Sequence, residues 1–285
     1  MNTYELIEYA VKIGLLTVEV AYTLRNYLQK DDKQSQTEEK LRIVLEEALN
    51  YFQKQNNQQK FKEPFSNVNL LSHFMTTTQY IDNPTIQELC NQIMAHELVS
   101  PGVTPNRIMQ ILSTVSFEDM QKFQIICSMN IGIITDYNND SIKPIARRRV
   151  MVPFNDTDEY SKKTGIYLTD INELQAIGLI SYNSAGYYMS GIPCKHPLIY
   201  ANGKTLYVLW HNKDRIPGGN ILLTKAGECL FNVISECEII DEYDIYVQAF
   251  MEYYGVAFAE QERYSIIKTE RKFTLVTNRK NHDLM

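Results

Sequence analysis

The sequence predicts an α+β protein, predominantly helical, in which an N-terminal helical bundle is followed by a winged-helix-like domain. Three observations favour this fold class. Apolar residues recur with a helical period through most of the first half of the chain. Residues 179–210 are then rich in tyrosine and contain the hairpin signal Asn202-Gly203, as paired strands do. A helix start at Thr224 follows, which completes the helix, strand, hairpin and helix order of a winged helix.

The 285 residues divide into three predicted segments. Residues 1–62 form an N-terminal helical arm, residues 63–135 a helical bundle, and residues 136–285 the winged-helix-like domain with an acidic helix and C-terminal strands. A content of 44% hydrophobic and 22% charged residues is typical of a soluble globular protein. The sequence has no secretion signal, and charges interrupt its longest apolar run, residues 6–28. We therefore expect a cytoplasmic protein with no membrane contact.

The arm is predicted to contain two helices. Residues 3–28 read as one helix, with Gly14 inside it at a cost of about 1 kcal/mol relative to alanine. Its broad apolar face indicates close packing against another helix, which makes residues 1–62 the expected contact of a homo-oligomer. Residues 41–61 read as the second helix, preceded by a polar loop or exposed helix end.

Three short helices are predicted next, over residues 85–98, 105–112 and 116–127. Asn83 is a good cap for the first, with Pro84 in its first turn. The connections are only a few residues long, which favours a compact bundle.

The winged-helix-like segment has recognisable start and stop signals. Thr169 is predicted to cap a helix that ends at Gly178, where glycine supplies a positive φ. A strand starts at Leu179, and Asn183–Gly186 is predicted to turn it. Thr224 is predicted to cap the helix that runs through Val233.

The C-terminal part is unevenly charged. Residues 236–254 read as an acidic helix, and the block 236–262 contains eight acidic and no basic residues. Residues 263–278 read as a strand or hairpin. The acidic block would repel a phosphate backbone lying beside it. The mildly basic residues 136–235, with a net charge of +2, would not.

Several short motifs resemble a known family through their order along the chain. They are Leu89–Glu97 in a helix, then Pro101-Gly102, Arg107, Leu112, Ser116, Asp119 and Phe123, then Gly178-Leu-Ile180 and Leu223-Thr-Lys-Ala-Gly227. This order, over residues 65–250, is similar to the bacterial family known as domain of unknown function 2806. This chain has Cys90 where the family usually has Trp, and His96 where a small or polar residue is common. The resemblance implies a fold but no catalytic residues, and its phage-associated relatives imply a role in phage defence or counter-defence.

Residues capable of catalysis are few. His96 and Glu97 would suit an acid–base pair or metal ligands, but no second histidine follows four residues on. We therefore favour a structural role for Glu97, as an interhelix partner, for example of Arg107, that closes the turn at Pro101. The five cysteines contain no CxxC pair, which indicates reduced structural thiols. We predict no catalytic residue, no metal and no cofactor.

Two sets of residues are candidates for binding. Arg147, Arg148 and Arg149, with Lys195 and Lys204 on the hairpins, are the candidate nucleic-acid or anion-binding residues. The helix that would read bases, residues 170–177, contains two acids and no Lys or Arg, so nucleic-acid binding is disfavoured.

The second set consists of aromatic residues. Tyr187, Tyr188 and Tyr200 are the candidate partner-binding residues. Such residues also serve as a platform for stacked bases or, more commonly, as cross-strand packing.

Three functional hypotheses follow. The first is a non-enzymatic intracellular bacterial or phage protein that acts through protein–protein contacts. The second is a winged-helix nucleic-acid-binding regulator that uses Arg147–Arg149 and the hairpin lysines. The third is an enzyme of unknown class with a site near His96 and Glu97.

Overall fold

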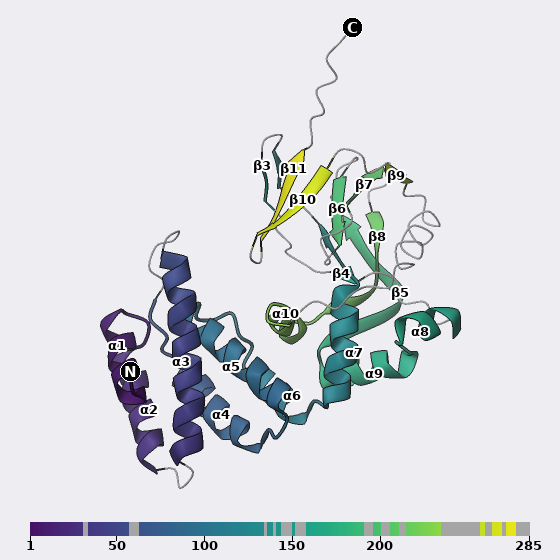
Figure 1. Cartoon of the computed structure of the whole chain (residues 1–285). Coiled ribbons are helices and arrows are strands. Elements are labelled where there is room, and N and C mark those ends of the chain that lie inside the picture. Colours follow the sequence, from purple (N-terminus) through teal and green to yellow (C-terminus); the bar gives the residue numbers. More distant parts are fainter. Residues whose placement is uncertain are drawn as a thin grey trace. The chain divides into compact units, whose positions relative to one another are not determined.

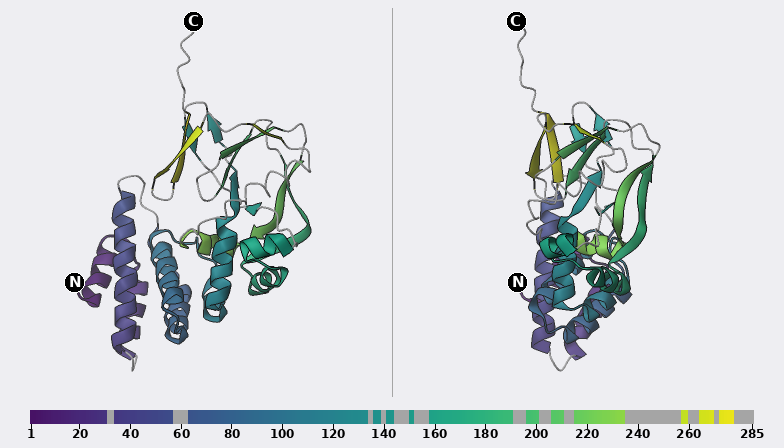
Figure 2. Two further views of the ribbon diagram at one scale, coloured as in Figure 1. Left: turned by 45° about the vertical axis from the view of Figure 1, so that its right-hand side comes forward. Right: turned by 90° about the vertical axis from the view of Figure 1, so that its right-hand side faces the viewer.

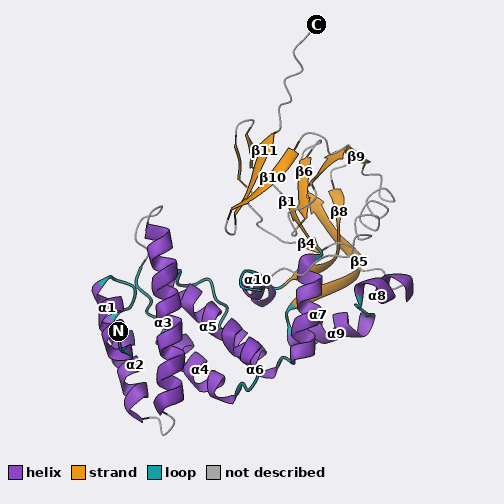
Figure 3. Ribbon diagram, in the orientation of Figure 1, coloured by secondary structure: helices purple, strands orange, loops and turns teal. Residues whose placement is uncertain are grey.

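The structure is a computed structural model of the chain. It describes residues 1–30, 34–56, 63–133, 136–138, 141–143, 150–151, 158–190, 196–200, 206–210, 215–234, 257–259, 264–269 and 272–277. More of these residues lie in helices than in strands, so the chain is α+β and predominantly helical (Figure 3).

The chain divides into two compact units. Unit 1 consists of Met1–Phe117 and Cys229–Ile234, and unit 2 consists of Glu118–Glu228 and Ser235–Met285. The predicted arm, residues 1–62, therefore belongs to the same unit as the helices that directly follow it.

Unit 1 is helical, and its interior lies between the helices. Its elements are α1 (Thr3–Lys12), α2 (Val18–Lys30), α3 (Gln34–Asn56), α4 (Val68–Thr77), the 3-10 helix η1 (Thr78–Tyr80), α5 (Pro84–Val99) and α6 (Ile108–Thr114). The long helix α3 packs against α1, α2 and α5 (Figures 1 and 2). Its buried residues Val44, Leu45 and Ala48 recur with the helical period that predicts this element.

The prediction of one helix over residues 3–28 is wrong, because the chain forms α1 and α2 with a break between them. Gly14 has φ +77°, a conformation that glycine adopts without steric cost. The Phe65 N–H donates to the Leu15 carbonyl at 2.9 Å, and the Thr17 N–H donates to the Phe65 carbonyl at 3.1 Å. A distant segment thus pairs with the backbone at the break, which periodicity cannot reveal.

The second helix begins at Gln34, before its predicted start at Leu41. Of the two predictions for the preceding polar residues, a loop or a helix end, the helix end is therefore correct from Gln34 onward. Its described part ends at Asn56.

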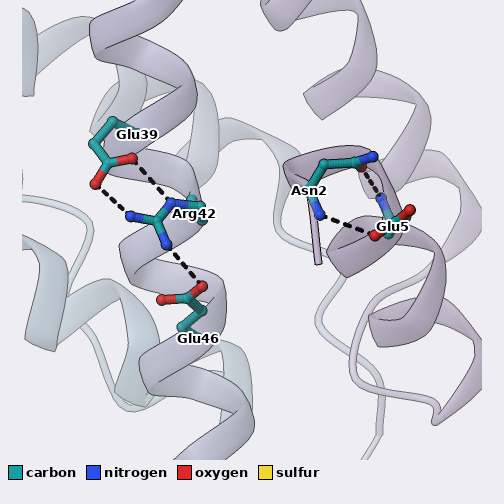
Figure 4. A network of polar contacts seen from close by, with 5 residues as sticks. All are labelled: Asn2, Glu5, Glu39, Arg42 and Glu46. Atoms are coloured by element: carbon teal, nitrogen blue, oxygen red, sulfur yellow. Dashed lines mark hydrogen bonds and ion pairs between the residues drawn. The ribbon is translucent and has the colours of Figure 1, made fainter.

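Polar contacts organise the starts and faces of these helices (Figure 4). Asn2 Oδ1 accepts the Glu5 N–H at 2.8 Å, and the Glu5 carboxylate accepts the Asn2 N–H at 2.9 Å, which completes a capping box. On α3, the Arg42 guanidinium donates to Glu39 and Glu46, and these partners hold the pKa of Arg42 above its ordinary value. Exposed pairs of this kind contribute little to stability.

The three predicted short helices are present. Asn83 caps α5 as predicted, because its Oδ1 accepts the N–H groups of Thr85 and Ile86 at 3.0 and 3.2 Å. The third of these helices, α7 (Phe117–Ser128), begins directly after Ser116, as the sequence indicates.

Unit 2 combines helices with two antiparallel sheets. Its further elements are β1 (Asn130–Ile133), β2 (Asp136–Asn138), β3 (Ser141–Lys143), β4 (Val150–Met151), α8 (Asp158–Thr164), α9 (Leu168–Ile177), β5 (Ile180–Ser190), β6 (His196–Tyr200), β7 (Leu206–Trp210), β8 (Arg215–Leu223), α10 (Lys225–Phe231), β9 (Ala257–Ala259), β10 (Tyr264–Thr269) and β11 (Lys272–Thr277). One sheet has the strand order β5-β8-β4-β1-β6-β7-β9, and the other β10-β11-β3-β2. For residues 263–278 the sequence predicts a strand or a hairpin, and the antiparallel pairing of β10 with β11 decides for the hairpin.

The predicted turn at Asn183–Gly186 is wrong, because β5 continues through it as one strand paired with β8 (Figure 1). Tyr182 pairs with Ile221 and Tyr187 with Gly219, so four residues of β5 oppose the single residue Asn220. The turn-forming residues therefore form a large β-bulge within a strand.

The start of α9 also differs from its prediction. Thr169 is not the cap, because the helix begins at Leu168 with Tyr167 as its N-cap residue. The Asp170 carboxylate accepts the Tyr167 N–H at 2.7 Å, and Lys122 Nζ of α7 donates to the Gly165 carbonyl at 2.6 Å. Lys122 also lies 3.6 Å from Asp170. One lysine thus joins α7 to the connection between α8 and α9.

None of the described helices is both long enough and apolar enough to cross a lipid bilayer.

Candidate functional site

Glu97 is the most deeply buried carboxylate among the described residues, with 1% of its surface exposed. It lies near the end of α5, where the chain leaves the helix and turns at Pro101-Gly102. Its Oε1 accepts the Gly102 N–H at 2.6 Å, and its Oε2 accepts those of Val103 and Thr104 at 3.1 and 2.8 Å. Both carboxylate oxygens therefore bind the backbone of one turn. A buried charge is tolerated when hydrogen bonds satisfy it in this way.

This arrangement confirms that Glu97 closes the turn at Pro101, but its partners differ from the one given as an example. The carboxylate binds three backbone N–H groups of the turn, where we expected the Arg107 side chain. His96, the neighbouring residue, is half-buried, and its carbonyl accepts the Ser100 N–H at 2.9 Å.

Cys229 lies in the part of α10 that belongs to unit 1. Its thiol is near Thr104 and Glu97, so it lies beside the turn at Pro101-Gly102. Burial raises the pKa of its thiol to about 11, the Thr104 hydroxyl lowers that pKa, and the negative charge of Glu97 raises it further. Burial likewise raises the pKa of the Cys90 thiol to about 12, against a lowering by Lys40. Because the thiolate is the reactive form of cysteine, both thiols are poor nucleophiles and poor metal ligands at neutral pH.

The cysteines in the described part of the chain form no disulfide bonds, and Cys90 and Cys127 are buried. Cys194 and Cys237 lie outside it. The described residues contain no group of three or more His, Cys, Asp and Glu side chains that would hold a metal ion.

The candidate anion-binding residues all lie outside the described residues. This applies to Arg147, Arg148 and Arg149 and to both hairpin lysines, Lys195 and Lys204. The acidic segment 236–254 lies outside them as well.

The three candidate tyrosines are not brought together. Tyr187 and Tyr188 lie on β5, whereas Tyr200 is the last residue of β6, and the strands β8, β4 and β1 separate these two in the sheet. At about 4.8 Å per strand, the backbones are about 19 Å apart. The Tyr187 hydroxyl lies 2.9 Å from Ser181 Oγ, whereas Tyr188 is 53% exposed. They therefore do not form one three-tyrosine platform.

The outward face of α9 carries little positive charge. Its exposed side chains are those of Thr169, Asn172, Glu173, Gln175 and Ala176. Ile171 and Leu174 are fully buried, and Asp170 is occupied by Lys122 and the Tyr167 N–H. This face therefore offers amide, hydroxyl, methyl and carboxylate groups, which do not neutralise phosphates.

Two of the sequence motifs contact each other in unit 2. Gly178 ends α9 with φ +93°, as predicted, and Thr224 Oγ1 donates to the Gly178 carbonyl at 2.6 Å. The same hydroxyl accepts the Gly227 N–H at 3.2 Å, which confirms Thr224 as the cap of α10. A Cβ on Gly227 would lie 2.1 Å from the Leu179 carbonyl oxygen, so only glycine fits there.

A family model described as "Protein of unknown function (DUF2806)" matches residues 23–247. The chain belongs to this family. The DUF2806 match covers α3 to α9, β5 to β8 and α10, and begins within α2. No curated protein and no solved structure matches the chain.

The residues that carry the DUF2806 resemblance have structural explanations in this chain. Glu97 organises the Pro101-Gly102 turn, and Gly178, Thr224 and Gly227 join the end of α9 to the start of α10. An acid four residues before a Pro-Gly pair is a signal that can be read from the sequence. The approach of Cys229 to Thr104, 125 positions earlier, leaves no signal in a single sequence.

Proposed function

We propose that this protein acts without catalysis, by contact with another protein. The contact surface is the outward face of α9, within a winged-helix-like unit formed by α7, α8, α9, β5, β8 and α10. The observation that carries the proposal is the composition of that face. It exposes Asn172, Glu173 and Ala176 and has no Lys or Arg anywhere in Leu168–Ile177.

The contacts within unit 2 support this assembly. Lys122 links α7 to the α8–α9 connection, and Thr224 links α9 and β5 to α10. Helices fixed at their ends in this way present one rigid face, and rigid elements lose little conformational entropy on binding.

The chemistry of unit 1 supports a function without catalysis. Glu97 is saturated by three backbone donors, and the thiols of Cys90 and Cys229 stay protonated at neutral pH. The rival enzyme hypothesis places a site near His96 and Glu97, and a His96→Gln variant with unchanged cellular function would contradict it.

The rival nucleic-acid hypothesis has one observation in its favour. Lys162 and Lys163 are exposed at the end of α8, just before α9. A duplex bound through these lysines and Arg147–Arg149 would show affinity that falls steeply with salt.

The deciding experiment places a photo-crosslinking amino acid at Asn172 in the full chain, inside the native cell. Asn106, an exposed residue of unit 1, is the matched control position. We expect a discrete protein adduct from Asn172 that is absent from Asn106 and is lost on Glu173→Lys. Equal labelling at both positions would contradict the proposal.

A parallel measurement tests nucleic acid directly. The purified chain is titrated with duplex DNA at low and physiological salt, alongside an Arg147–Arg149 triple alanine variant. We expect no tight complex. Salt-sensitive binding that the triple variant loses would establish the rival function instead.

A role in phage defence or counter-defence remains part of the proposal. It predicts that deletion of the gene changes the plaque number on challenged cells, and that Glu173→Lys reproduces the effect of the deletion.

Self-association through residues 1–62 is a further proposal. The apolar face that predicts it is buried within unit 1, including Leu6, Ile7, Val20 and Leu24. A contact through this segment would therefore use Val18 and Tyr22 of α2, which are 75% and 67% exposed and one helical turn apart. If the chain is oligomeric, Tyr22→Arg should lower its subunit number in sedimentation. An unchanged number would exclude this contact.

A further inference from the structure

Strand β5 lies at an edge of the seven-stranded sheet. Among the described strands it pairs with β8 alone. Edge strands expose unpaired backbone groups that recruit further strands, and proteins usually protect them with charged residues or proline. The eleven residues of β5, ISYNSAGYYMS, contain neither. Side chains from other positions bind backbone groups of this strand instead.

The direction of each N–H in β5 follows from the strand register. The Thr224 N–H donates to the Leu179 carbonyl at 3.0 Å, which marks these two as a hydrogen-bonded pair. Such pairs alternate along an antiparallel ladder, so Tyr182, opposite Ile221, occupies a non-hydrogen-bonded position. Its N–H points away from β8, toward the open edge. There it donates to Gln175 Oε1 of α9 at 2.6 Å. A side chain thus occupies the donor that a further strand would use.

The bulge occupies the next part of the same edge. Asn220 Nδ2 donates to the Asn183 and Ser184 carbonyls at 3.1 and 3.3 Å. Asn183 Oδ1 accepts the Ala185 N–H at 3.0 Å, and Asn183 Nδ2 donates to the Gly186 carbonyl at 3.2 Å. Gly186 closes the bulge with φ +77°. Five consecutive residues, 182–186, therefore each have a backbone group bound by a side chain of the same chain.

We propose that Gln175, which binds the Tyr182 N–H, and the bulge that Asn183 and Asn220 hold in place together form an edge seal. This seal prevents β5 from pairing with β5 of a second copy of this chain. The seal uses amide side chains in place of the missing charges. The bulge also interrupts the regular spacing of donors and acceptors that an added strand needs. This proposal does not rest on the proposed function, although Gln175 is also one of the exposed residues of α9.

The register defines a sharp test. Between Tyr182 and Tyr187, β5 has three more residues than β8 has between their partners Ile221 and Gly219. Deletion of Ser184, Ala185 and Gly186 leaves Asn183 opposite Asn220 and restores a regular edge strand. We expect self-association at least about tenfold tighter than that of the wild-type chain, measured by sedimentation over a range of concentrations.

Two further variants serve as controls. Ser184→Ala, an exposed position within the bulge, keeps its backbone hydrogen bonds and should behave as wild type. In the deletion background, Ser181→Lys places a charge on the uncharged strand and should reverse the association, because edge lysines oppose pairing. A folded deletion variant that sediments like the wild type at every concentration would overturn the proposal.

A substitution keeps the proposal testable if the deletion variant does not fold. Asn183→Ala with Asn220→Ala removes the four hydrogen bonds that hold the bulge. We expect this double variant to associate more strongly than wild type. We also expect the Ala185 amide to exchange its hydrogen faster than in wild type. Faster exchange without association would show that the amides shape the bulge but do not guard the edge, which would also overturn the proposal.

Discussion

At the residue scale, a few side chains have contacts that decide their identity. Glu97 is the clearest case, because a buried carboxylate must be matched by donors and here has three. Gly227 is the other, because the Leu179 carbonyl occupies the place of its Cβ. Both belong to the motifs on which the family resemblance rests, and both make contacts that stabilise the fold.

Glu97→Ala should destabilise the protein by roughly 3 kcal/mol, because it leaves three buried N–H groups without an acceptor. Glu97→Gln keeps one acceptor oxygen and should cost less. The measurement is denaturant unfolding of the full chain. Glu173→Ala, at an exposed acid, is the control and should stay within about 0.5 kcal/mol of wild type. Equal stability of Glu97→Ala and the control would contradict the assigned role.

Gly227→Ala should lower the free energy of unfolding, whereas Gly→Ala at an ordinary exposed helix position raises it. In an exposed helix, alanine is more stable than glycine by about 1 kcal/mol. Here the added methyl group meets a backbone carbonyl that cannot move aside, so we expect a loss of about 2–3 kcal/mol in thermal or denaturant unfolding. A stabilised variant would show that α10 does not pack as described.

At the scale of the element, helix starts and strand edges are set by side chains from neighbouring elements. Asp170 and Lys122 position the start of α9, and Asn220 of β8 holds the bulge of β5. On the α3 side of unit 1, Lys40 Nζ donates to the Thr78 carbonyl at 2.7 Å and so links α3 to η1. These contacts couple elements that the sequence presents as separate.

Lys122 and Asp170 should show measurable coupling in a double-mutant cycle. Their side chains are 23% and 15% exposed, so water screens the pair only in part. With Lys122→Met and Asp170→Asn, we expect a coupling free energy of roughly 1 kcal/mol from unfolding of the single and double variants. Full additivity would indicate that each residue binds only the backbone.

Glu47 of α3 should make stability depend on pH. Burial, and then the negative charge of Glu88 on α5, raise the pKa of its carboxyl above the ordinary value. The folded state then holds a proton that the unfolded state has released. The free energy of unfolding therefore falls as pH rises from the ordinary carboxyl pKa through the raised one.

Glu47→Gln removes this titration. We expect the variant to be more stable than wild type at pH 7, and this advantage to be smaller at pH 4. Its free energy of unfolding should therefore depend less on pH than that of wild type, as measured by denaturant unfolding at both pH values. Glu118→Gln, at an exposed acid of α7, should leave the profile unchanged. A Glu47→Gln profile parallel to that of wild type would contradict this account.

At the scale of the whole molecule, the units are not continuous in sequence. Unit 1 includes Cys229–Ile234, more than a hundred residues after Phe117. Leu230 in this segment is fully buried, and the adjacent Cys229 lies beside Thr104. A fragment that ends at Phe117 would lack this part of its interior.

Leu230→Ala should therefore weaken unit 1, although it changes a residue far along the chain. A buried Leu→Ala substitution typically costs 2–5 kcal/mol through lost contacts and the cavity that it leaves. In hydrogen exchange, we expect reduced protection of the Gly102 and Thr104 amides. Loss of protection confined to residues 118–228 would contradict the division of the units.

Much of the fold was predictable because it depends on neighbours in sequence. Asn83, Gly178 and Thr224 mark helix ends through contacts within a few residues, and the apolar periods of α3 and α5 identify buried faces. The candidate site was predictable only in part. The structural role of Glu97 was expected, but its partner was assigned to Arg107 because a turn's N–H groups leave no mark on residue type.

The sequence alone determined the α+β class, the family, and the caps of α5 and α10, because each depends on residue order and local hydrogen bonding. The tertiary structure decided the break at Gly14, the bulge in β5 and the meeting of Cys229 with Thr104. In the first two, a backbone group is hydrogen-bonded by a partner distant in sequence, and in the third, burial brings a thiol and a hydroxyl together. The free energy of that contact overrides the local preference, and only the folded chain brings the partners together.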